Sequence, residues 1–503
     1  MRRFTLEIRR SILRKATLAF GMLGILAAMF PLDSQALPLF ARQTGQNCVA
    51  CHAGGQFPEL TPYGRIFKLT GYTIGDRDKV PLSVMAVASY SKVSDTSKSD
   101  NPSADFSRNG VPILAAGSLF AGGKITDNIG AFAQWTYNNY AAQTADGSYT
   151  GHAGMDNVDI RYADRFITPQ RDLVFGVSLN NNPSVSDPWN TAAAWMQYVP
   201  VPSPTSNQFI DGAAPFPGFG SGGNLAGISA YMYLNKLVYA ELGTYQTANG
   251  IFSPLSAGLN NASTTKLQGA NNPYWRLALT HEWGAHNIMV GTSGMIAHVY
   301  DDPTDTSDAN SVSRILNTGV DAQYQYILDP HTFTAQVAYM RQRTDYSANT
   351  VAANAGIGSP HGLLAADGSP LPDANSSDTT NVFRAKVSYV YQAKYGGSLA
   401  YFNLTGTTNT ALQTSGYDSN GQVTSTDPLG TGIASTRVNG NLSGNPGTSG
   451  FTYEAFWMPV QYARVGVQYT AYSKYNGATD NYDGMGRNAK DNNSLFIYVW
   501  GAY

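Results

Sequence analysis

The chain has 503 residues, of which 43% are hydrophobic, 12% aromatic and only 13% charged, with 51 Gly, 31 Tyr and a formal net charge of -2. The charged fraction is about half of the usual value, and five Glu stand against 29 Asp, which excludes the Glu- and Lys-rich surface of a soluble helical protein. No apolar run reaches 18 residues, which excludes a bundle of membrane-spanning helices. The aromatic content excludes disorder, and the small net charge gives no reason to expect nucleic-acid binding.

The first 36 residues have the pattern of a secretory signal peptide. Six basic residues within 2–15 precede an apolar stretch at 16–30, and Ser34-Gln35-Ala36 is a small-residue cleavage site. The Arg9-Arg10 pair resembles a twin-arginine signal. The chemistry of the next motif requires export of an unfolded chain, so we favour general secretion, with a mature chain that begins at Leu37.

Both cysteines lie in Cys48-Val49-Ala50-Cys51-His52, the spacing of a c-type haem attachment site. Two intervening residues place both sulfurs on one face of a helical turn, where they can form thioethers with a haem, and His52 can then bind the iron axially. The same pair could form a disulfide or a redox dithiol, but no βαβ pattern follows it. Zinc needs four ligands, and no second Cys/His pair stands nearby. The preferred interpretation is one covalent haem c.

We expect residues 37–81 to form a small, α-helical cytochrome c-type segment. About 45 residues are too few for an independent hydrophobic core, so the haem and the region that follows must complete it. Thr61-Pro62 has the pattern of a helix N-cap and first turn, which predicts a helix over 63–70 that Gly71 ends.

Other haem contacts are less constrained by the sequence. Arg65 and Lys68 lie on the predicted helix and could pair with haem propionates; a solvated helix face is the alternative. No Met or His occurs within 54–83, so the sixth iron ligand is water or a residue of the following region. Met85 is the nearest candidate in the sequence.

From Leu82 onward, segments of 9 to 15 residues alternate between apolar and polar side chains, as strands with two unlike faces do. Their connections alternate between short and long, which is typical of outer-membrane barrels with short periplasmic turns and long outer loops. A soluble sandwich also has alternating strands, but it has no reason to alternate its connections. The predicted strands are near 82–93, 113–122, 127–138, 155–165, 171–180, 224–234, 236–247, 272–283, 286–299, 314–328, 331–345, 379–392, 395–407, 449–458, 461–475 and 492–503.

The expected fold class is therefore all-β, with residues 82–503 forming a 16-stranded antiparallel transmembrane β-barrel of porin type behind the haem segment. The last strand ends on Tyr503, which resembles the terminal signature of outer-membrane barrels. Aromatic residues near strand ends fit the girdles at the two membrane interfaces: Trp135, Tyr137, Trp275, Trp283 and Trp457. The third long loop, 181–223, corresponds in order to the loop that constricts porins, and it carries Trp189, Trp195 and Met196.

The same alternation predicts which side chains face the lumen. A charge that faces lipid near the midplane costs roughly 2 to 4 kcal/mol, so the charged residues of the strands should point inward. These are Asp159, Arg161, Arg276, Glu282, Asp321, Arg384, Lys386, Glu454 and Arg464. Met85 shares its side of the strand with Ser83 and should point inward too. Asp residues that cluster in the loops at 301–308 and 480–491 could attract divalent cations at a pore mouth, or could simply be solvated.

The haem segment ahead of the barrel resembles the fused outer-membrane monohaem cytochrome-porins of iron-oxidising bacteria. The likeness covers about 35 residues in detail and the barrel as an architecture. It rests on Ala41-Arg42-Gln43-Thr44-Gly45, Cys48 to His52, Phe57-Pro58-Glu59-Leu60-Thr61-Pro62, Gly64-Arg65, Phe67-Lys68 and Gly71-Tyr72.

This resemblance implies an electron-transfer protein in outer-membrane lipid. Its donor would be extracellular Fe(II) or another reductant, its acceptor a periplasmic c-type cytochrome, and its enzyme class, if it is an enzyme, an Fe(II) oxidase. One haem inside the barrel would provide a redox centre within a hydrocarbon layer about 30 Å thick. Two alternatives remain open: a haem-plugged channel for passive solute flux, and outward electron transfer to extracellular oxidants.

Overall fold

The computed structural model describes residues 38–55, 58–78, 80–99, 106, 108–143, 149–189, 224–258, 265–351, 375–409, 416–417, 423–425, 438 and 440–503. The predicted signal peptide at 1–36 lies outside these ranges, as do Leu37 and the loop residues Trp195 and Met196.

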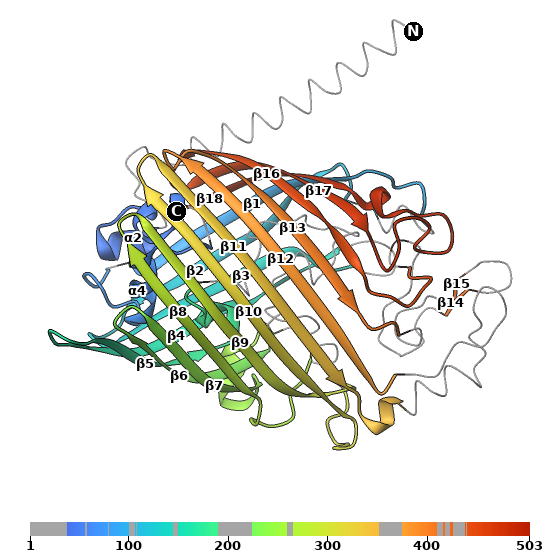
Figure 1. Cartoon of the computed structure of the whole chain (residues 1–503), viewed down its shortest axis with the longest axis horizontal. Coiled ribbons are helices and arrows are strands. Elements are labelled where there is room, and N and C mark those ends of the chain that lie inside the picture. Colours follow the sequence, from blue (N-terminus) through green and yellow to red (C-terminus); the bar gives the residue numbers. More distant parts are fainter. Residues whose placement is uncertain are drawn as a thin grey trace, which may run out of the picture.

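Sixteen strands form one closed antiparallel barrel, in which each strand pairs with its neighbours in the chain and the first pairs with the last (Figure 1). The predicted 16-stranded barrel is thereby confirmed. The strands are β1 Leu82–Val93, β2 Pro112–Lys124, β3 Ile129–Gln143, β4 Tyr149–Ile167, β5 Asp172–Asn180, β6 Leu225–Leu234, β7 Val238–Thr247, β8 Pro273–Trp283, β9 His286–Tyr300, β10 Val312–Leu328, β11 His331–Asp345, β12 Ser377–Tyr391, β13 Tyr395–Gly406, β16 Thr448–Val460, β17 Ala463–Lys474 and β18 Ser494–Ala502. A separate two-stranded sheet, β14 Gly416–Tyr417 and β15 Val423–Ser425, lies in the connection between β13 and β16.

Most strand boundaries fall within a few residues of those predicted. The largest differences are at β3 and β4, which extend well beyond the predicted 127–138 and 155–165 toward each other. Their pairing continues past two register shifts. A bulge reverses the side on which side chains point, so the alternation that marks a strand in the sequence is lost there although the backbone pairing continues.

The two ends of the barrel differ in their connections. Tight turns join β2–β3, β4–β5, β6–β7, β8–β9, β10–β11, β12–β13 and β16–β17, and the described start of β1 and the end of β18 lie at the same end. In the turn between β6 and β7, Asn235 and Lys236 both have φ of 52°, the left-handed conformation that two-residue hairpins require. This short-turn end is the periplasmic end of an outer-membrane barrel.

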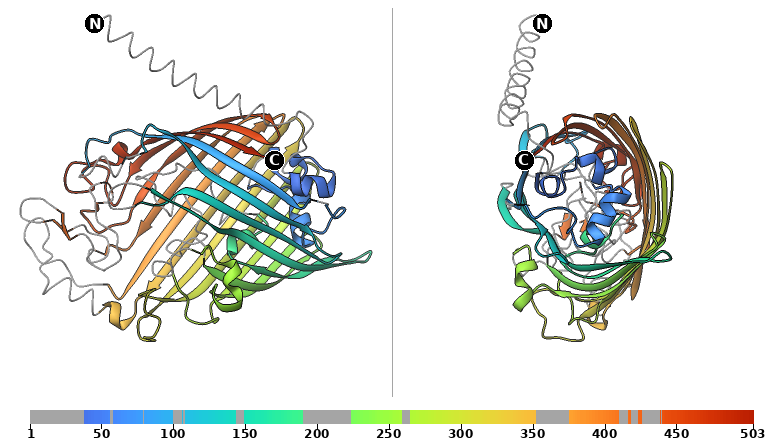
Figure 2. Two further views of the ribbon diagram at one scale, coloured as in Figure 1. Left: turned by 180° about the vertical axis from the view of Figure 1, so that it is seen from behind. Right: turned by 90° about the vertical axis from the view of Figure 1, so that its left-hand side faces the viewer.

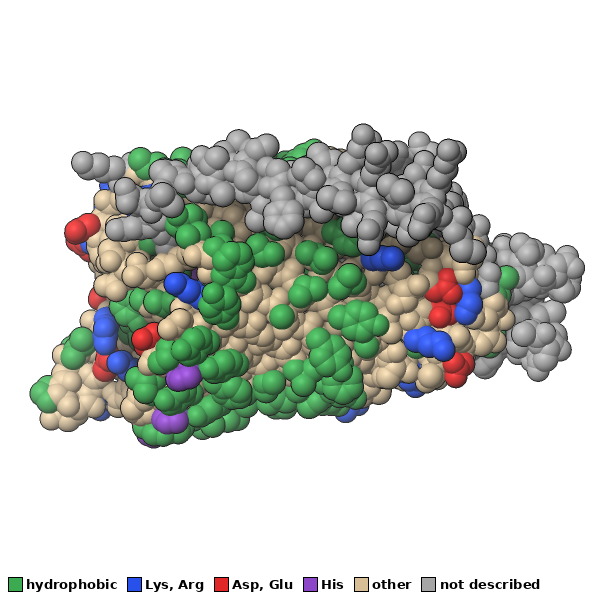
Figure 3. Space-filling view, turned by 90° about the horizontal axis from the view of Figure 1, so that it is seen from above, with side chains coloured by type: hydrophobic (Ala, Val, Ile, Leu, Met, Phe, Trp, Pro, Cys, Tyr) green, Lys and Arg blue, Asp and Glu red, His purple; other side chains and the backbone are tan. Residues whose placement is uncertain are grey.

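The outer wall is apolar. Figure 3 shows hydrophobic side chains along this wall, with acidic side chains toward its ends. Four of the predicted girdle residues, Trp135, Tyr137, Trp283 and Trp457, are each more than 40% exposed on the outside, as residues that contact lipid in this fold are. Trp275 lies on the same outward side of β8 and is partly covered.

Short helices lie inside the ring of strands at the short-turn end (Figure 2). They are α2 Pro38–Thr44, α3 Cys48–Cys51, the 3-10 turn η1 Ala53–Gly55 and α4 Pro62–Leu69, which confirms the predicted helix over 63–70 to within one residue. Gly71 has a φ of 72° and follows α4 as its predicted terminator. Further short helical turns are α6 Pro183–Ser186, η2 Gly250–Leu255 and η3 Ala489–Asn492. None of the helices in the described ranges is long and apolar enough to cross a membrane.

Candidate functional site

The N-terminal segment 38–78, called the plug below, is fixed inside the periplasmic end of the barrel. The side chain of Gln43 donates to the carbonyl oxygen of Tyr72 (2.6 Å) and accepts from the N–H of Lys124 (3.0 Å), at the end of β2. Four strands further round the ring, the hydroxyl of Tyr231 on β6 donates to the carbonyl oxygen of Leu69 (2.7 Å). These contacts hold the plug to two separate parts of the wall.

Cys48, Cys51 and His52 stand together in this plug. Cys48–Cys51 is the single turn of helix α3, and the N–H of His52 donates to the carbonyl oxygen of Cys48 (2.8 Å). The two thiols are not joined in a disulfide. The N–H of Cys48 donates to Oε1 of Gln461 (3.2 Å), in the turn between β16 and β17. Two thiols three residues apart share one helix face and an imidazole follows directly, so this donor set fits a covalent c-type haem.

Helix α4 holds α3 in place through its N-terminus. Thr61 caps α4 by accepting from the N–H of Gly64 (3.1 Å), while its own N–H donates to the carbonyl oxygen of Cys51 (2.9 Å) and its hydroxyl to that of Ala50. A Cβ at Gly64 would collide with the carbonyl of Cys51. The close approach of the two helices therefore requires glycine at this position.

Partial burial makes the thiol of Cys51 harder to ionise. Desolvation raises the pKa of the Cys51 thiol from 9.0 to about 11, and the neighbouring Cys48 thiol adds to this increase. The thiolate is the nucleophilic form of cysteine. An increase of two pKa units lowers the thiolate fraction at neutral pH roughly 100-fold, so the folded plug is a poor nucleophile.

Arg65 and Lys68 connect the plug to the barrel. Both are buried, at 3% and 8% exposure, so the alternative of a solvated helix face is wrong. Arg65 donates to Oδ1 of Asn287 (2.9 Å) and to the carbonyl oxygen of Leu60 (2.8 Å), and Lys68 donates to the carbonyl oxygen of Asp187 (2.9 Å). Burial lowers the pKa of Lys68 to about 8. Pairing of the two cations with haem propionates stays a prediction.

Two methionines, Met85 on β1 and Met458 on β16, bear on the expected sixth iron ligand. Met85 packs against the buried cluster that includes Tyr498 and Trp500 on β18, on the inward side that the alternation predicts. Met458 on β16 is 3% exposed, and a methyl group on Gly55 would lie 3.7 Å from its Cε. Met458 was not predicted as a site residue. Its place on the inward side of a strand, next to a short turn, could have indicated it. Met85 stays the predicted candidate for the sixth iron ligand, and Met458 is a second one.

A buried ion pair joins the plug to β4. Nε of Arg161 lies 2.7 Å from Oδ2 of Asp159, and both side chains are fully buried. The hydroxyl of Tyr72 donates to the same carboxylate (2.5 Å), and Nη2 of Arg161 donates to the carbonyl oxygen of Ser186 (2.8 Å). This ion pair of β4 therefore connects the barrel wall to both the plug and helix α6.

A second buried charged group lies on β8 and β10. Arg276 on β8 contacts Asp321 on β10 through two nitrogens, at 2.5 and 2.8 Å, and Asp187 at 3.4 Å. Trp189 is 1% exposed, and its backbone N–H donates to Oδ1 of Asp187 (3.2 Å). The guanidinium of Arg65 lies 6.0 Å from its ring. The described start of the third long loop therefore folds into the lumen, as predicted, and seals against the plug.

The charged side chains that were predicted to face the lumen do so, and one of them lies at the rim. Glu282 is exposed because β8 ends one residue later, at Trp283. The remaining eight are buried or nearly so, through contacts with the plug, the loop or each other: Asp159, Arg161, Arg276, Asp321, Arg384, Lys386, Glu454 and Arg464. Lys386 also forms an ion pair with Glu59 of the plug, at 2.5 Å.

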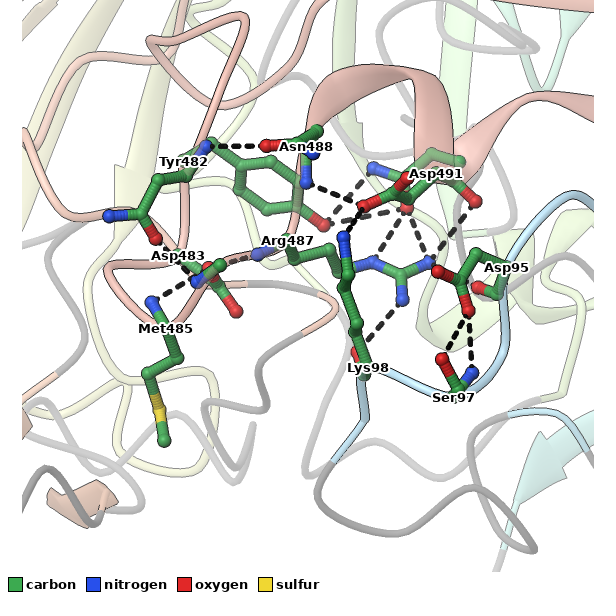
Figure 4. Close-up of polar contacts among 12 residues, drawn as sticks. Asp95, Ser97, Lys98, Tyr482, Asp483, Met485, Arg487, Asn488 and Asp491 are labelled. Carbon is green, nitrogen blue, oxygen red and sulfur yellow. Dashed lines mark hydrogen bonds and ion pairs between the residues drawn. The ribbon is translucent and has the colours of Figure 1, made fainter.

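The predicted acidic cluster at 480–491 is a structural latch at the outer end of the barrel (Figure 4). Oδ1 of Asp483 accepts from the N–H groups of Met485 and Arg487, both at 2.9 Å. Asp491 pairs with Lys98 (2.8 Å), and Arg487 donates to the carbonyl oxygen of Lys98 (2.8 Å). The latch thereby ties the loop after β1 to the loop before β18.

The acidic cluster at 301–308 also shapes its own loop. Asp302 accepts from the N–H and hydroxyl of Thr304, and Asp305 accepts in the same way from Ser307. These hydrogen bonds hold the pKa of each carboxyl below its usual value. Within the described part of the chain, no three His, Cys, Asp or Glu side chains are grouped to hold a bare metal ion.

No protein family model matches this chain. No curated protein matches its sequence. Solved structures with a similar fold include Salmonella typhi OmpF, in complex with daunomycin, at 13% identity, with 84% of this chain and 97% of that chain covered and a TM-score of 0.41. The outer membrane channel DcaP of Acinetobacter baumannii is 11% identical, with coverage of 84% and 96% and a TM-score of 0.41. An anion-selective porin from Comamonas acidovorans is 9% identical, with coverage of 84% and 98% and a TM-score of 0.39.

The closed ring of sixteen strands, its apolar outer wall and its unequal ends are those of a transmembrane barrel. This chain is a porin-like β-barrel of the bacterial outer membrane, with a helical plug in its periplasmic end.

Proposed function

We propose that this barrel carries one covalent haem c and transfers electrons from extracellular Fe(II) to a periplasmic c-type cytochrome. The proposal rests on one observation: two thiols that form no disulfide, followed by an imidazole, share one helical turn inside the periplasmic end of the barrel. Cys48 and Cys51 would hold the haem through thioethers, and His52 would bind its iron. When bound, the haem supplies a one-electron redox centre.

The residues around this turn fix its position. The α3–α4 contact at Gly64 sets the orientation of the two cysteines, and Gln461 anchors the N-terminus of α3 to the wall. Leu69, Trp189 and their aromatic neighbours on β6 and β7 form a buried cluster between plug and wall. A low dielectric and a rigid protein shell are the means by which a protein tunes the potential of a bound haem.

Reduction by Fe(II) tests the proposal. In stopped-flow mixing at neutral pH, excess Fe(II) is expected to reduce the haem of the purified protein, seen as the change of its Soret band. His52→Ala keeps both thiols and should retain the covalent haem, but without the axial imidazole its midpoint potential and reduction rate should change. If the wild-type haem stays oxidised in excess Fe(II), the assignment of iron as the donor is wrong.

A second candidate function is passive solute transport, which the sixteen-stranded barrel favours because barrels of this size enclose aqueous channels. The contacts of the plug favour a closed lumen. We expect liposomes that contain the wild-type protein to show little ion conductance, and a variant lacking residues 38–78 to conduct as an open porin does. High conductance of the intact chain would support transport as the function.

A further inference from the structure

The outer wall contains an apolar groove of about 350 Å³ over β9 to β13 and β16. Its floor lies at three alanines with outward side chains, Ala322, Ala335 and Ala385, on three neighbouring strands. Larger outward side chains flank them: Ile288, Tyr324, Val337, Val387, Leu399, Tyr401 and Phe451. Since alanine leaves space where its neighbours project, the wall is hollowed at this point.

A patch of histidines and aromatic residues lies between the groove and the periplasmic end of the barrel. Figure 3 shows histidines among hydrophobic side chains at this end of the wall. The ring of Trp283 is stacked between those of His281 and His286, with ring centroids 5.3 Å apart on each side. His331 lies on β11 at the same rim, with its ring 5.6 Å from that of Tyr391.

Two of these histidines are oriented by the same kind of hydrogen bond to a tyrosine hydroxyl. Nδ1 of His286 lies 2.7 Å from the hydroxyl of Tyr324, and Nδ1 of His331 lies 2.7 Å from the hydroxyl of Tyr389. When the tyrosine hydroxyl donates to Nδ1, a neutral imidazole carries its proton on Nε2. Both imidazoles can therefore donate from Nε2 to an anion at the rim.

The groove and the patch form one continuous surface. Tyr324 belongs to both, because it lines the groove and binds His286. Along β11, His331 and Ala335 point to the same side, four residues apart, which is about 13 Å along the strand. An acyl chain that descends from a headgroup at the rim would run over this distance into the groove.

We propose that this surface binds one glycerophospholipid of the periplasmic leaflet, with an acyl chain in the groove and the phosphate at His286 and His331. The wall faces hydrocarbon at the groove and headgroups at the rim, so a lipid meets both parts in the correct order. Imidazole N–H groups, the hydroxyl of Tyr391 and the exposed Lys394 in the turn after β12 supply donors for the phosphate. Asp329, in the turn before His331, and Glu282 are the acidic groups at the same rim.

Native mass spectrometry of the full-length protein, incubated with phosphatidylglycerol in mild detergent, tests the site. The wild-type chain is expected to retain one lipid. Ala335→Phe fills the groove and should lower the lipid-bound fraction about tenfold, and the double variant His286→Ala/His331→Ala should lower it too. The matched control Ala230→Phe changes an outward alanine on β6, outside the groove, and should retain the lipid.

The result that overturns the site is an equal lipid-bound fraction in the wild type and in both groove and rim variants. A mass that shows two or more chains, with no bound lipid, would also overturn it, since a second copy would then cover the wall. Heat-modifiable gel mobility confirms folding of each variant. If Ala335→Phe does not fold, the double variant His286→Ala/His331→Ala tests the proposal by itself.

Discussion

Replacing Cys48 and Cys51 together with serine is expected to remove covalent haem completely while leaving the barrel folded. Serine keeps the shape of the helical turn but cannot form a thioether. On a denaturing gel stained for haem peroxidase activity, the wild-type band should stain and the double variant should not. Loss of a covalent cofactor is an all-or-none effect, which makes it the largest change expected of any substitution in the plug.

The barrel should survive this change because the cysteine side chains support little of it. The barrel is held by the ladder of backbone hydrogen bonds between sixteen strands, and α3 is anchored to the wall by the backbone N–H of Cys48, which serine retains. Heat-modifiable mobility should therefore be unchanged. His52→Ala serves as the control, since it should keep the stain. A wild-type band without stain would contradict both this prediction and the proposed electron transfer.

The raised pKa of Cys51 bears on when a haem could be attached to the chain. Because burial raises the pKa of Cys51 to about 11, few thiolates form once the plug is folded inside the barrel. Thioether formation needs a reactive thiol. A haem bound as proposed would therefore be attached more readily before the plug folds into the barrel than after it.

The barrel could be predicted from the sequence because a strand shows its two faces locally. The alternation in 316–326 identified β10 and the inward position of Asp321 without any knowledge of its partners. The alternation does not predict how exposed a residue is at the end of a strand. Glu282 has the inward side of β8, yet it is exposed because the strand ends at the rim beside it.

The Cys48–His52 motif could be recognised for a similar reason, since both thiols and the imidazole lie within five residues. The residues that surround this motif in the fold could not be predicted, because they are distant from it in the chain. Glu59 meets Lys386 across 327 residues, and Arg65 meets Asn287 across 222. Met458 lies beside Gly55 of the plug because β16 ends in a short turn there. Such contacts follow from the closure of the ring, which no local pattern encodes.

Replacing Arg276 with methionine is expected to destabilise the protein by about 3 to 5 kcal/mol. The guanidinium contacts Asp321 and Asp187, and the three side chains are at most 4% exposed. Without it, two carboxylates are left together in a site closed to water, and the cost of burying them is no longer offset. Equilibrium unfolding in urea, with the protein in lipid vesicles, measures the loss.

The exposed pair Arg165 and Asp172 is the matched control, because it has the same chemistry and a similar distance, 2.7 Å, but side chains that are 33% and 25% exposed. Arg165→Met should cost less than about 1 kcal/mol. In the double variant Arg276→Met/Asp321→Leu, the loss should be smaller than in Arg276→Met alone, because one of the two buried carboxylates is gone. Equal losses in Arg276→Met and Arg165→Met would mean that water reaches Asp321, and hence that the plug and the third loop do not seal the lumen.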